Sequence, residues 1–396
     1  MNRPDSGIQF DTLLAAADAA ASRISPRVAE IESNGYLPQD IADDLAAAGL
    51  YRLLTPTEYG GHEVSAGLFV EIIERLAQAD ASTAWCTFIS CTSCVLAGYL
   101  DPAVSRQLFG NPELKAAGVY APRGKAVRET RDGQRGFRVT GRWFWGSATK
   151  NADVILGGCL VLDADGKPEL LDGGRPRVQS ILFNRSQVSH LDNWDAFGLL
   201  GSGSGEFQVN DVFVPEALSA CLMADRPLDR PLYRFPVFGL LGIGIGAVAL
   251  GVARHAMDAL IDLAREKTPQ SSNKTLAMRV STQQAVARAE ARWRSARAFM
   301  MDAVEAGWDE AERSSEIAVS TRRDIRLATT HAVHSAQEIV SSMYQLGGGN
   351  AIFTQSPLQR CLRDIHVITQ HFMVSDSTYE LTGRLLLGLD TDITML

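Results

Sequence analysis

The pattern of apolar residues changes twice along this chain of 396 residues, and the two changes limit the folds that it can adopt. Up to about residue 118, segments such as "PQDIADDLAAAGLYRLL" place apolar residues three and four positions apart, which predicts helices. From 119 to 225, "GFRVTGRWFW" alternates and "FQVNDVFVP" is rich in β-branched residues, which predicts strands. Long helical patterns then return. The sequence therefore predicts an α+β chain with a helical domain (1–118), a small β domain (119–225) and a helical bundle (226–396).

The charge and hydropathy of the chain argue against binding to nucleic acid or to a membrane. The net charge of −8 argues against a protein that binds nucleic-acid phosphates, because no long basic stripe offsets it. The N-terminus lacks a basic region followed by an apolar stretch, so no signal peptide is predicted. The most apolar stretch, 238–253, is short for a membrane span and contains glycines. We therefore expect a cytoplasmic protein that binds neither nucleic acid nor a membrane.

The six cysteines show neither a secreted disulfide framework nor a metal-ligand spacing. Cys91 and Cys94 form a C-x-x-C pair, a spacing that redox proteins also use. The pair lies in "TAWCTFISCTSCVLAGYL", which is typical of a buried helix and lacks the strand–helix–strand context of a redox motif. We therefore interpret both cysteines as core residues and expect no metal site.

Four stretches resemble, in the right order, motifs of the acyl-CoA dehydrogenase superfamily. They are "TPTEYGG" (55–61), "GRWFWGSATKNADVIL" (141–156), "GLLGSGSGEFQVNDVFVP" (198–215) and "YQLGGGNAIFTQSPLQRCLRDIHVITQH" (344–371). The predicted order of domains is also that of this fold. The resemblance covers nearly the whole chain. It implies an N-terminal helical domain, a central small β-barrel or sandwich, a C-terminal four-helix bundle and a homotetramer.

The segment after Arg363 and Asp364 separates two branches of this superfamily. Common acyl-CoA dehydrogenases carry a catalytic glutamate nine residues after that arginine, where this chain has Phe372. Phenylalanine cannot accept the proton that a dehydrogenase removes beside the thioester carbonyl of its substrate. One position earlier stands His371, and "RDIHVITQH" is similar to the two-component flavin monooxygenases of the same fold. These include the hydroxylases of steroid-derived phenols and of hydroxyphenylacetate.

A second histidine in this segment, His366, is predicted to point elsewhere. His366 and His371 are five residues apart, which on one helix separates them by roughly 140°. By spacing alone, either is more often a core histidine than a ligand. The resemblance assigns catalysis to His371, beside the flavin and substrate, and leaves His366 to packing. Because an imidazole titrates near neutral pH, we expect His371 to accept a phenol proton and return it later.

The resemblance also assigns residues to the flavin. Ser147 in "WFWGSA" corresponds to a serine near the flavin N5 edge, where its hydroxyl can make one hydrogen bond and steady a flavin hydroperoxide. From the residues alone it is equally a strand-end serine bonded to backbone. Trp85 and Trp143 are candidate walls for the flavin ring, although such tryptophans are usually core residues. The other candidate cofactor-binding residues are Ser202, Ser204, Gln345, Gly347, Gly348 and Arg279, the last reaching the flavin phosphate across a subunit boundary.

Two further features qualify this interpretation. "GIGIGAVALG" (242–251) contains the dinucleotide-binding pattern G-x-G-x-x-A, but it lies outside any strand–helix–strand unit. We interpret its small residues as sites of close helix packing. Many of the similar monooxygenases have a histidine eight residues after the tryptophan that corresponds to Trp85, where this chain has Ser93. Either another residue supports the oxygen chemistry, or the substrate is not the usual phenol.

The leading hypothesis is the oxygenase component of a two-component flavin-dependent monooxygenase. It would receive reduced flavin (FMNH2 or FADH2) from a separate flavin reductase and react with O2 through a flavin hydroperoxide. It would then hydroxylate an aromatic or polycyclic small molecule, with N- or S-oxygenation also open. Two alternatives remain: an atypical acyl-CoA dehydrogenase or oxidase with its base outside residues 363–372, and a non-enzymatic helical module that has lost its cofactor.

Overall fold

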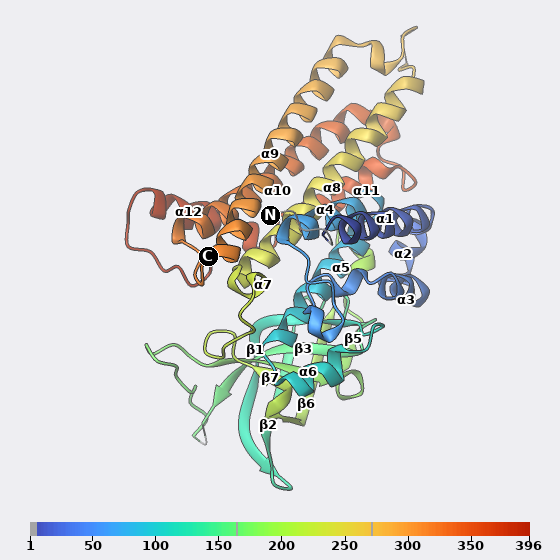
Figure 1. Ribbon diagram of the computed structural model, residues 1–396. Coiled ribbons are helices and arrows are strands. Elements are labelled where there is room, and N and C mark those ends of the chain that lie inside the picture. The colour runs from blue at the N-terminus through green and yellow to red at the C-terminus, as the bar shows by residue number, and fades with distance from the viewer. Residues whose placement is uncertain (1–5, 164, 271) are drawn as a thin grey trace.

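The computed structural model describes residues 6–163, 165–270 and 272–396, with helices in both terminal regions and strands between them (Figure 1). The N-terminal helices are α1 (Ser6–Ile24), α2 (Val28–Asn34), α3 (Gln39–Ala47), α4 (Ala66–Ala79), α5 (Ala81–Cys94) and α6 (Pro102–Phe109). The strands are β1 (Ala116–Arg131), β2 (Gln134–Trp143), β3 (Val154–Leu162), β4 (Val178–Asn184), β5 (Ser189–Leu191), β6 (Glu206–Pro215) and β7 (Ser219–Ala220). The C-terminal helices are α7 (Pro231–Arg234), α8 (Val237–Glu266), α9 (Val280–Arg313), α10 (Val319–Gly347), α11 (Pro357–Ile368) and α12 (Asp376–Leu386).

The strands form one mixed sheet in the order β5-β6-β2-β1-β3-β4-β7. β1 and β3 are parallel and the other neighbours are antiparallel. Asp132 and Gly133 make the turn between β1 and β2 with φ of 52° and 79°, the left-handed values that a two-residue hairpin turn needs. Among the described residues, β5 and β7 are the two ends of the strand order and do not pair with each other, so the predicted small barrel or sandwich stays a prediction.

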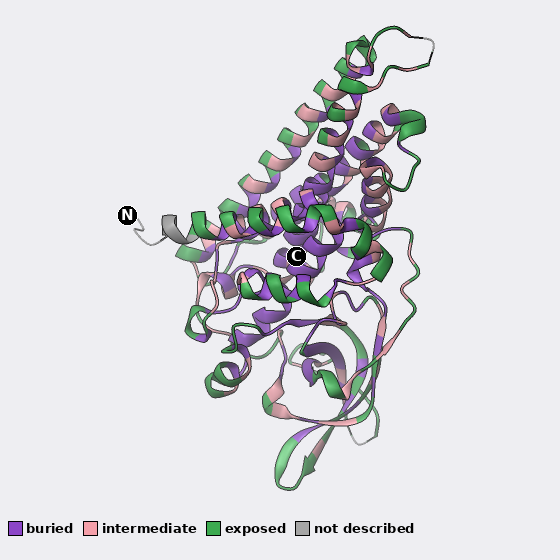
Figure 2. Cartoon of the chain, turned by 90° about the vertical axis from the view of Figure 1, so that its right-hand side faces the viewer, coloured by how far each residue is buried: buried purple, intermediate pink, exposed green. Residues whose placement is uncertain are grey.

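The two helical regions share one hydrophobic core, in which α8 packs against α4 and α5. Figure 2 shows buried residues, in purple, gathered in the middle of the molecule where helices meet. A Cβ atom on Gly244 would lie 2.7 Å from the Phe88 ring, and one on Gly251 would lie 2.5 Å from the Glu74 carbonyl oxygen. Such distances leave no room for a side chain. The interpretation of "GIGIGAVALG" as a close-packing segment is therefore confirmed.

Two helical segments are long and apolar enough to cross a membrane, Ala81–Gly98 and Val237–Glu266. In the protein, 94% and 78% of the residues in their apolar windows are buried. Length and composition are weak evidence here, because the core helices of folded proteins pass the same test.

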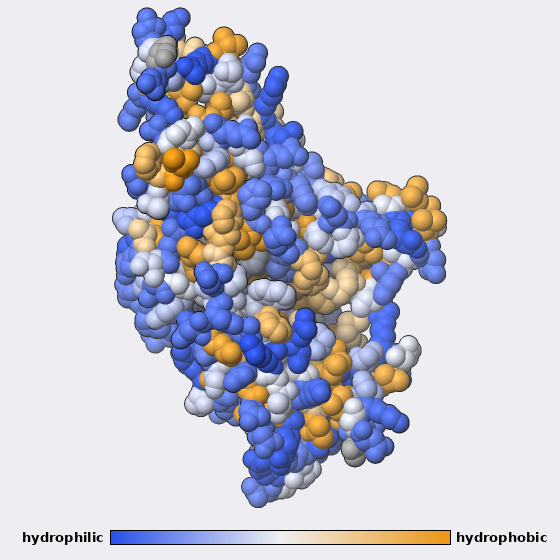
Figure 3. Space-filling model, turned by 180° about the vertical axis from the view of Figure 1, so that it is seen from behind, coloured by the Kyte–Doolittle hydropathy of each residue, from blue (hydrophilic) through white to orange (hydrophobic). Residues whose placement is uncertain are grey.

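An apolar patch is left uncovered at the end of α12. Leu386, Leu387 and Leu389 are exposed, with Leu387 reaching 76%. Figure 3 shows hydrophobic side chains gathered on this projecting segment, at the right of the view. Three large apolar side chains close together in sequence and open to water are typical of a surface that another chain covers.

Candidate active site

Four residues assigned to the flavin from the sequence form one buried chain of hydrogen bonds. Trp85 lies on α5, Ser147 lies in the loop after β2, and Ser202 and Ser204 lie just before β6. The Trp85 Nε1 atom is 3.0 Å from Ser147 Oγ. Ser204 Oγ lies 2.6 Å from both Ser147 Oγ and Ser202 Oγ. Ser202 Oγ also lies 2.6 Å from the Leu199 carbonyl oxygen, which ends the chain.

The protons available set the direction of each of these hydrogen bonds. The Leu199 carbonyl can only accept, so the Ser202 hydroxyl donates to it. Each hydroxyl has one proton, so Ser204 donates to Ser202, and Ser147 donates to Ser204. The Trp85 N–H donates to Ser147. Ser147 therefore has no proton left to donate and one lone pair left with which to accept.

The backbone around Ser147 adopts a conformation that costs energy. Trp145 and Ala148 have φ of 60° and 62°, in the left-handed region that non-glycine residues rarely occupy. The Ala148 N–H donates to the Ser202 carbonyl at 3.0 Å, which ties this loop to the segment before β6. The Trp145 side chain is 69% exposed. An exposed indole two residues from an accepting hydroxyl fits a flavin ring, whose reduced form donates a hydrogen bond from N5.

His371 lies beside Trp85, but it does not lie on the helix that was predicted. α11 ends at Ile368, and His371 directly precedes a short 3-10 turn, η10 (Phe372–Val374). The centroid of the His371 ring is 5.9 Å from that of the Trp85 ring and 5.1 Å from that of Phe372. The histidine and the hydrogen-bonded chain therefore belong to one site.

One ring nitrogen of His371 is already engaged. Its Nδ1 accepts a hydrogen bond from the Met373 backbone N–H at 3.3 Å. A neutral imidazole that accepts at Nδ1 carries its proton on Nε2, so Nε2 is a donor. Burial, with a smaller effect of the Arg326 charge, lowers the pKa of His371 to about 4. The predicted titration near neutral pH is wrong for this state, and at pH 7 His371 presents a neutral hydrogen-bond donor.

Known proteins match the chain along most of its length. Two family models match, the acyl-CoA dehydrogenase N-terminal domain at residues 11–117 and the C-terminal domain at residues 243–376. An indole-3-acetate monooxygenase of Pseudomonas putida is 33% identical over 385 residues, covering 97% of this chain and 94% of the relative. A flavin-dependent monooxygenase, oxygenase subunit HsaA, of Rhodococcus jostii is 27% identical and covers 89% of this chain and 92% of its own. This chain belongs to the flavin-dependent monooxygenases of the acyl-CoA dehydrogenase fold.

A solved structure agrees with this assignment. The crystal structure of 3-HSA hydroxylase from Rhodococcus sp. RHA1 superposes on this monooxygenase with a TM-score of 0.88 at 25% identity, over 97% of this chain and 99% of that one. The acyl-CoA dehydrogenase fold and the assignment to the oxygenase components, both predicted from sequence motifs, are confirmed.

Arg363 and Asp364 hold the loop that carries the serines of this monooxygenase. The buried Asp364 carboxylate accepts the Leu199 N–H at 2.7 Å. The Arg363 guanidinium donates to the Glu32 carboxylate at 2.6 Å and to the Phe197 carbonyl at 3.3 Å. Burial raises the pKa of Asp364 to about 7. Because its carboxylate is bonded to a backbone amide, Asp364 positions the loop.

The structure places Trp143 in the core of the sheet. Its ring is fully buried in the core of the sheet and stacks on Phe207, with centroids 5.0 Å apart. Its Nε1 donates to the Gly158 carbonyl at 2.8 Å. Trp143 is therefore a core residue and does not form a wall of the site, which is the commoner fate of a tryptophan in a strand.

The candidate phosphate contacts lie together, at the ends of the long C-terminal helices. Arg279 precedes α9, while Gln345, Gly347 and Gly348 lie at the end of α10. Lys267, which follows α8, links the two segments. Its Nζ donates to the Gly347 carbonyl at 2.6 Å. Its own carbonyl accepts the N–H of Leu276, three residues before Arg279. Among the described residues, no hydrogen bond joins this group to the serine chain.

Four further residues have structural roles. The Ser93 hydroxyl donates to a backbone carbonyl of its own helix at 2.8 Å. Cys91 and Cys94 are buried free thiols whose pKa burial raises, that of Cys94 to about 11, which is typical of core cysteines. His366 lies on α11 with its Nδ1 3.3 Å from the Gln337 amide nitrogen, so it faces packing as predicted.

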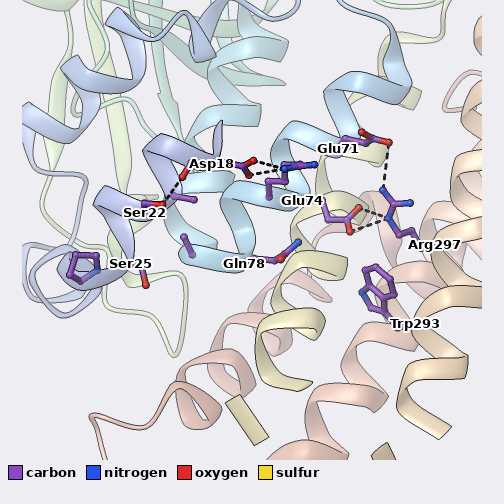
Figure 4. A pocket seen from close by; sticks show the side chains of 12 residues that line it. Asp18, Ser22, Ser25, Glu71, Glu74, Gln78, Trp293 and Arg297 are labelled. Carbon is purple, nitrogen blue, oxygen red and sulfur yellow. Dashed lines mark hydrogen bonds and ion pairs between the residues drawn. The ribbon is translucent and has the colours of Figure 1, made fainter. Parts of the chain in front are cut away.

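A cavity of about 990 Å³ lies between α1, α4 and α9 (Figure 4), and it contains none of the predicted site residues. Its charged side chains pair with one another. Arg75 lies 2.6 Å from the Asp18 carboxylate, and Arg297 lies 2.8 Å from the Glu74 carboxylate. We assign no chemistry to this cavity, since its charges are already satisfied.

Proposed function

We propose that this monooxygenase is the oxygenase component of a two-component system that hydroxylates an aromatic small molecule with reduced flavin and O2. A separate reductase supplies FMNH2 or FADH2. The oxygenase-subunit name of the Rhodococcus jostii relative supports the reductase, and the name of the Pseudomonas putida relative supports an aromatic substrate. The observation that carries the proposal is the oriented chain from Trp85 through Ser147, which leaves an acceptor beside His371.

Bound reduced flavin supplies the reaction with O2, and the residues of the chain bind, orient and exclude water. The free lone pair of Ser147 suits the N5–H of reduced flavin, whereas oxidised flavin has an acceptor at N5. Trp145 offers an exposed aromatic face for the ring. His371 Nε2–H is a donor for an oxygen atom in the site. His371 therefore orients its partner in our account, and it is not the general base that the sequence suggested.

The dehydrogenase alternative requires a carboxylate to remove the substrate proton. Within the described part of the chain, no carboxylate is bonded to His371, Trp85 or Ser147. Two buried aspartates, Asp364 on α11 and Asp80 between α4 and α5, accept hydrogen bonds from backbone amides. Asp364 accepts from Leu199, and Asp80 caps α5 by accepting the Thr83 N–H at 2.7 Å. This arrangement favours the monooxygenase over a non-enzymatic module as well, because strain and buried hydroxyls are retained at one site.

We also propose that the protein is a cytoplasmic homotetramer without a membrane contact, built on the three predicted domains with a four-helix bundle formed by α8 to α11. The exposed leucines at the end of α12 support assembly. Exposed apolar residues also flank the candidate phosphate contacts, Met278 and Val280 beside Arg279, and Ile352 and Phe353 after Gly348. We therefore propose that Arg279 and the glycine turn contact the flavin phosphate of a partner subunit.

The proposal is tested by mixing the protein with FMNH2 or FADH2 under argon, adding a panel of aromatic acids that begins with indole-3-acetate, and admitting O2. We expect a hydroxylated product in an amount close to the reduced flavin consumed. Hydrogen peroxide alone with every substrate, together with bleaching of oxidised flavin by a saturated acyl-CoA under argon, would instead identify a dehydrogenase.

A further inference from the structure

Arg326 is a buried cation for which the described residues supply no anionic partner. It lies on α10 and is only 4% exposed. Burial lowers its pKa to about 10, and no nearby carboxylate opposes this shift. A pKa near 10 still leaves the guanidinium charged at neutral pH. The interior of the protein therefore holds a positive charge that no carboxylate of the described chain neutralises.

The hydrogen-bonding capacity of this guanidinium is largely unused. Its Nη1 is 3.5 Å from the sulfur of Met373, a weak acceptor, and its Nη2 is 3.3 Å from the Thr378 hydroxyl. Its Nε has no hydrogen-bond partner among the described residues. The Thr378 hydroxyl donates in turn to the Met373 carbonyl at 3.2 Å, so these residues form one small cluster. The Nε–Nη2 edge of a guanidinium can donate two parallel hydrogen bonds to one carboxylate. In Arg326, Nε makes no hydrogen bond to the described residues and Nη2 makes only a long one.

An unpaired buried charge destabilises a folded protein, whereas a ligand that supplies the opposite charge removes the penalty. A residue that served packing alone would fill this space at lower cost if it were apolar. The combination of burial, charge and an unused edge therefore points to an anion that is absent from the chain itself.

The cluster adjoins the candidate active site. Met373 contacts both groups, because its N–H donates to His371 Nδ1 and its sulfur accepts from Arg326. The Arg326 charge also contributes to the low pKa of His371. On the side of α8, the facing residue is Gly242, where a Cβ would lie 3.4 Å from Arg326 Nη1. A side chain longer than that of alanine would cover the guanidinium at this position.

We propose that Arg326 binds the carboxylate of an aromatic acid substrate through its Nε–Nη2 edge, while His371 contacts the remainder of the molecule. The inference rests on the proposed function and adds the substrate class to it, an aromatic ring that carries a carboxylate. Thr378 and Met373 hold the guanidinium in position. The binding of one carboxylate neutralises the buried charge and satisfies Nε in one step.

The experiment compares a carboxylate with its neutral isostere, so that ring contacts cancel. Binding of indole-3-acetate and of indole-3-acetamide is measured by equilibrium dialysis against the protein with reduced flavin under argon, where no turnover occurs. We expect the wild type to prefer the acid. Arg326→Met should weaken binding of the acid by about 10- to 100-fold, as for loss of a charged hydrogen-bonded pair, with little change for the amide.

Two variants complete the design. Arg323→Met removes the same charge three residues earlier, where Arg323 is paired with Asp324 at 2.8 Å, and it should leave the preference unchanged. Arg326→Lys keeps the charge but lacks the Nε–Nη2 edge. It should weaken the binding of the acid and not that of the amide, and it serves as the test if Arg326→Met does not fold. An equal acid-to-amide ratio in the wild type and in the Arg326 variants would overturn the inference.

The outcome also separates this inference from the proposed function. A preference for the acid that depends on Arg326, without hydroxylated product on admission of O2, would support the carboxylate site and refute the monooxygenase proposal for this substrate class. Hydroxylated product together with an acid-to-amide binding ratio that is unchanged in Arg326→Lys would support the monooxygenase proposal and refute the carboxylate site.

Discussion

Replacement of Ser147 by alanine tests the direction of the hydrogen-bonded chain. The variant leaves the buried Trp85 N–H without its acceptor at 3.0 Å, and a buried donor without a partner costs about 1–3 kcal/mol. It also removes the bond to Ser204, worth about 1 kcal/mol. We therefore expect the free energy of unfolding to fall by about 2–4 kcal/mol.

A second variant isolates the part of this loss that belongs to the Trp85 N–H. Trp85→Phe keeps an aromatic ring and removes the donor. In that background, Ser147→Ala leaves no N–H without a partner, so its cost should shrink to about 1 kcal/mol. The double-mutant cycle should therefore be non-additive by about 1–3 kcal/mol.

Urea unfolding followed by circular dichroism measures the cycle, at one protein concentration because assembly contributes to stability. The same variants are tested for flavin binding under argon. Loss of the Ser147 acceptor should weaken the binding of reduced flavin by about 3- to 10-fold and should change the binding of oxidised flavin little, since only the reduced form donates from N5. Additive stabilities in the cycle, or equal losses for both flavin forms, would refute the assigned direction.

Three further predictions concern stability. Since the pKa of His371 is about 4 in the folded protein and about 6.5 in the unfolded chain, its contribution is present above pH 6.5 and lost as the pH falls. Urea midpoints should show about 2–3 kcal/mol lost between pH 7 and pH 4 in the wild type but not in His371→Gln, and parallel curves would contradict this. The pKa of Asp364 is raised to about 7, so the wild type loses stability as the pH rises and this carboxyl must ionise in the folded protein. Asp364→Asn still accepts the Leu199 N–H and does not ionise. In urea unfolding, its free energy of unfolding relative to the wild type should therefore be about 1–4 kcal/mol more favourable at pH 8 than at pH 5. A Cβ at Gly198 would lie 2.4 Å from the Arg363 carbonyl carbon, so Gly198→Ala should lower the thermal midpoint, while Gly349→Ala, with open space around it, should not.

The sequence predicted much of the site because its motifs lie at the ends of strands and helices, where this fold places its site. Ser147 ends the alternating segment "GRWFWGS", and Ser202 and Ser204 lie in a glycine-rich segment before the next strand. Trp85 follows the capped start of α5, where Asp80 accepts the Thr83 N–H. Local patterns of this kind place side chains at the ends of elements, and the fold then brings those ends together.

The remaining features depend on contacts that one sequence does not contain. Trp143 and Trp145 are two positions apart, so a continuous strand would place both on one face. Trp143 is buried and Trp145 is exposed, because β2 ends at Trp143 and Trp145 takes a left-handed φ. His371 was placed on a helix because no proline or glycine marks the end of α11 at Ile368. No motif in the sequence marks Arg326 as buried, because a charged residue in a patterned helix is usually exposed. Its burial follows from the packing of α8, η10 and α12 around it.

Oxygen-isotope labelling tests the central claim most directly. The protein is supplied with chemically reduced flavin and indole-3-acetate under ¹⁸O2, and the product is examined by mass spectrometry. We predict one ¹⁸O atom in each molecule of product. A product without the label, or ¹⁸O found only in hydrogen peroxide while the aromatic acid is recovered unchanged, would contradict the account.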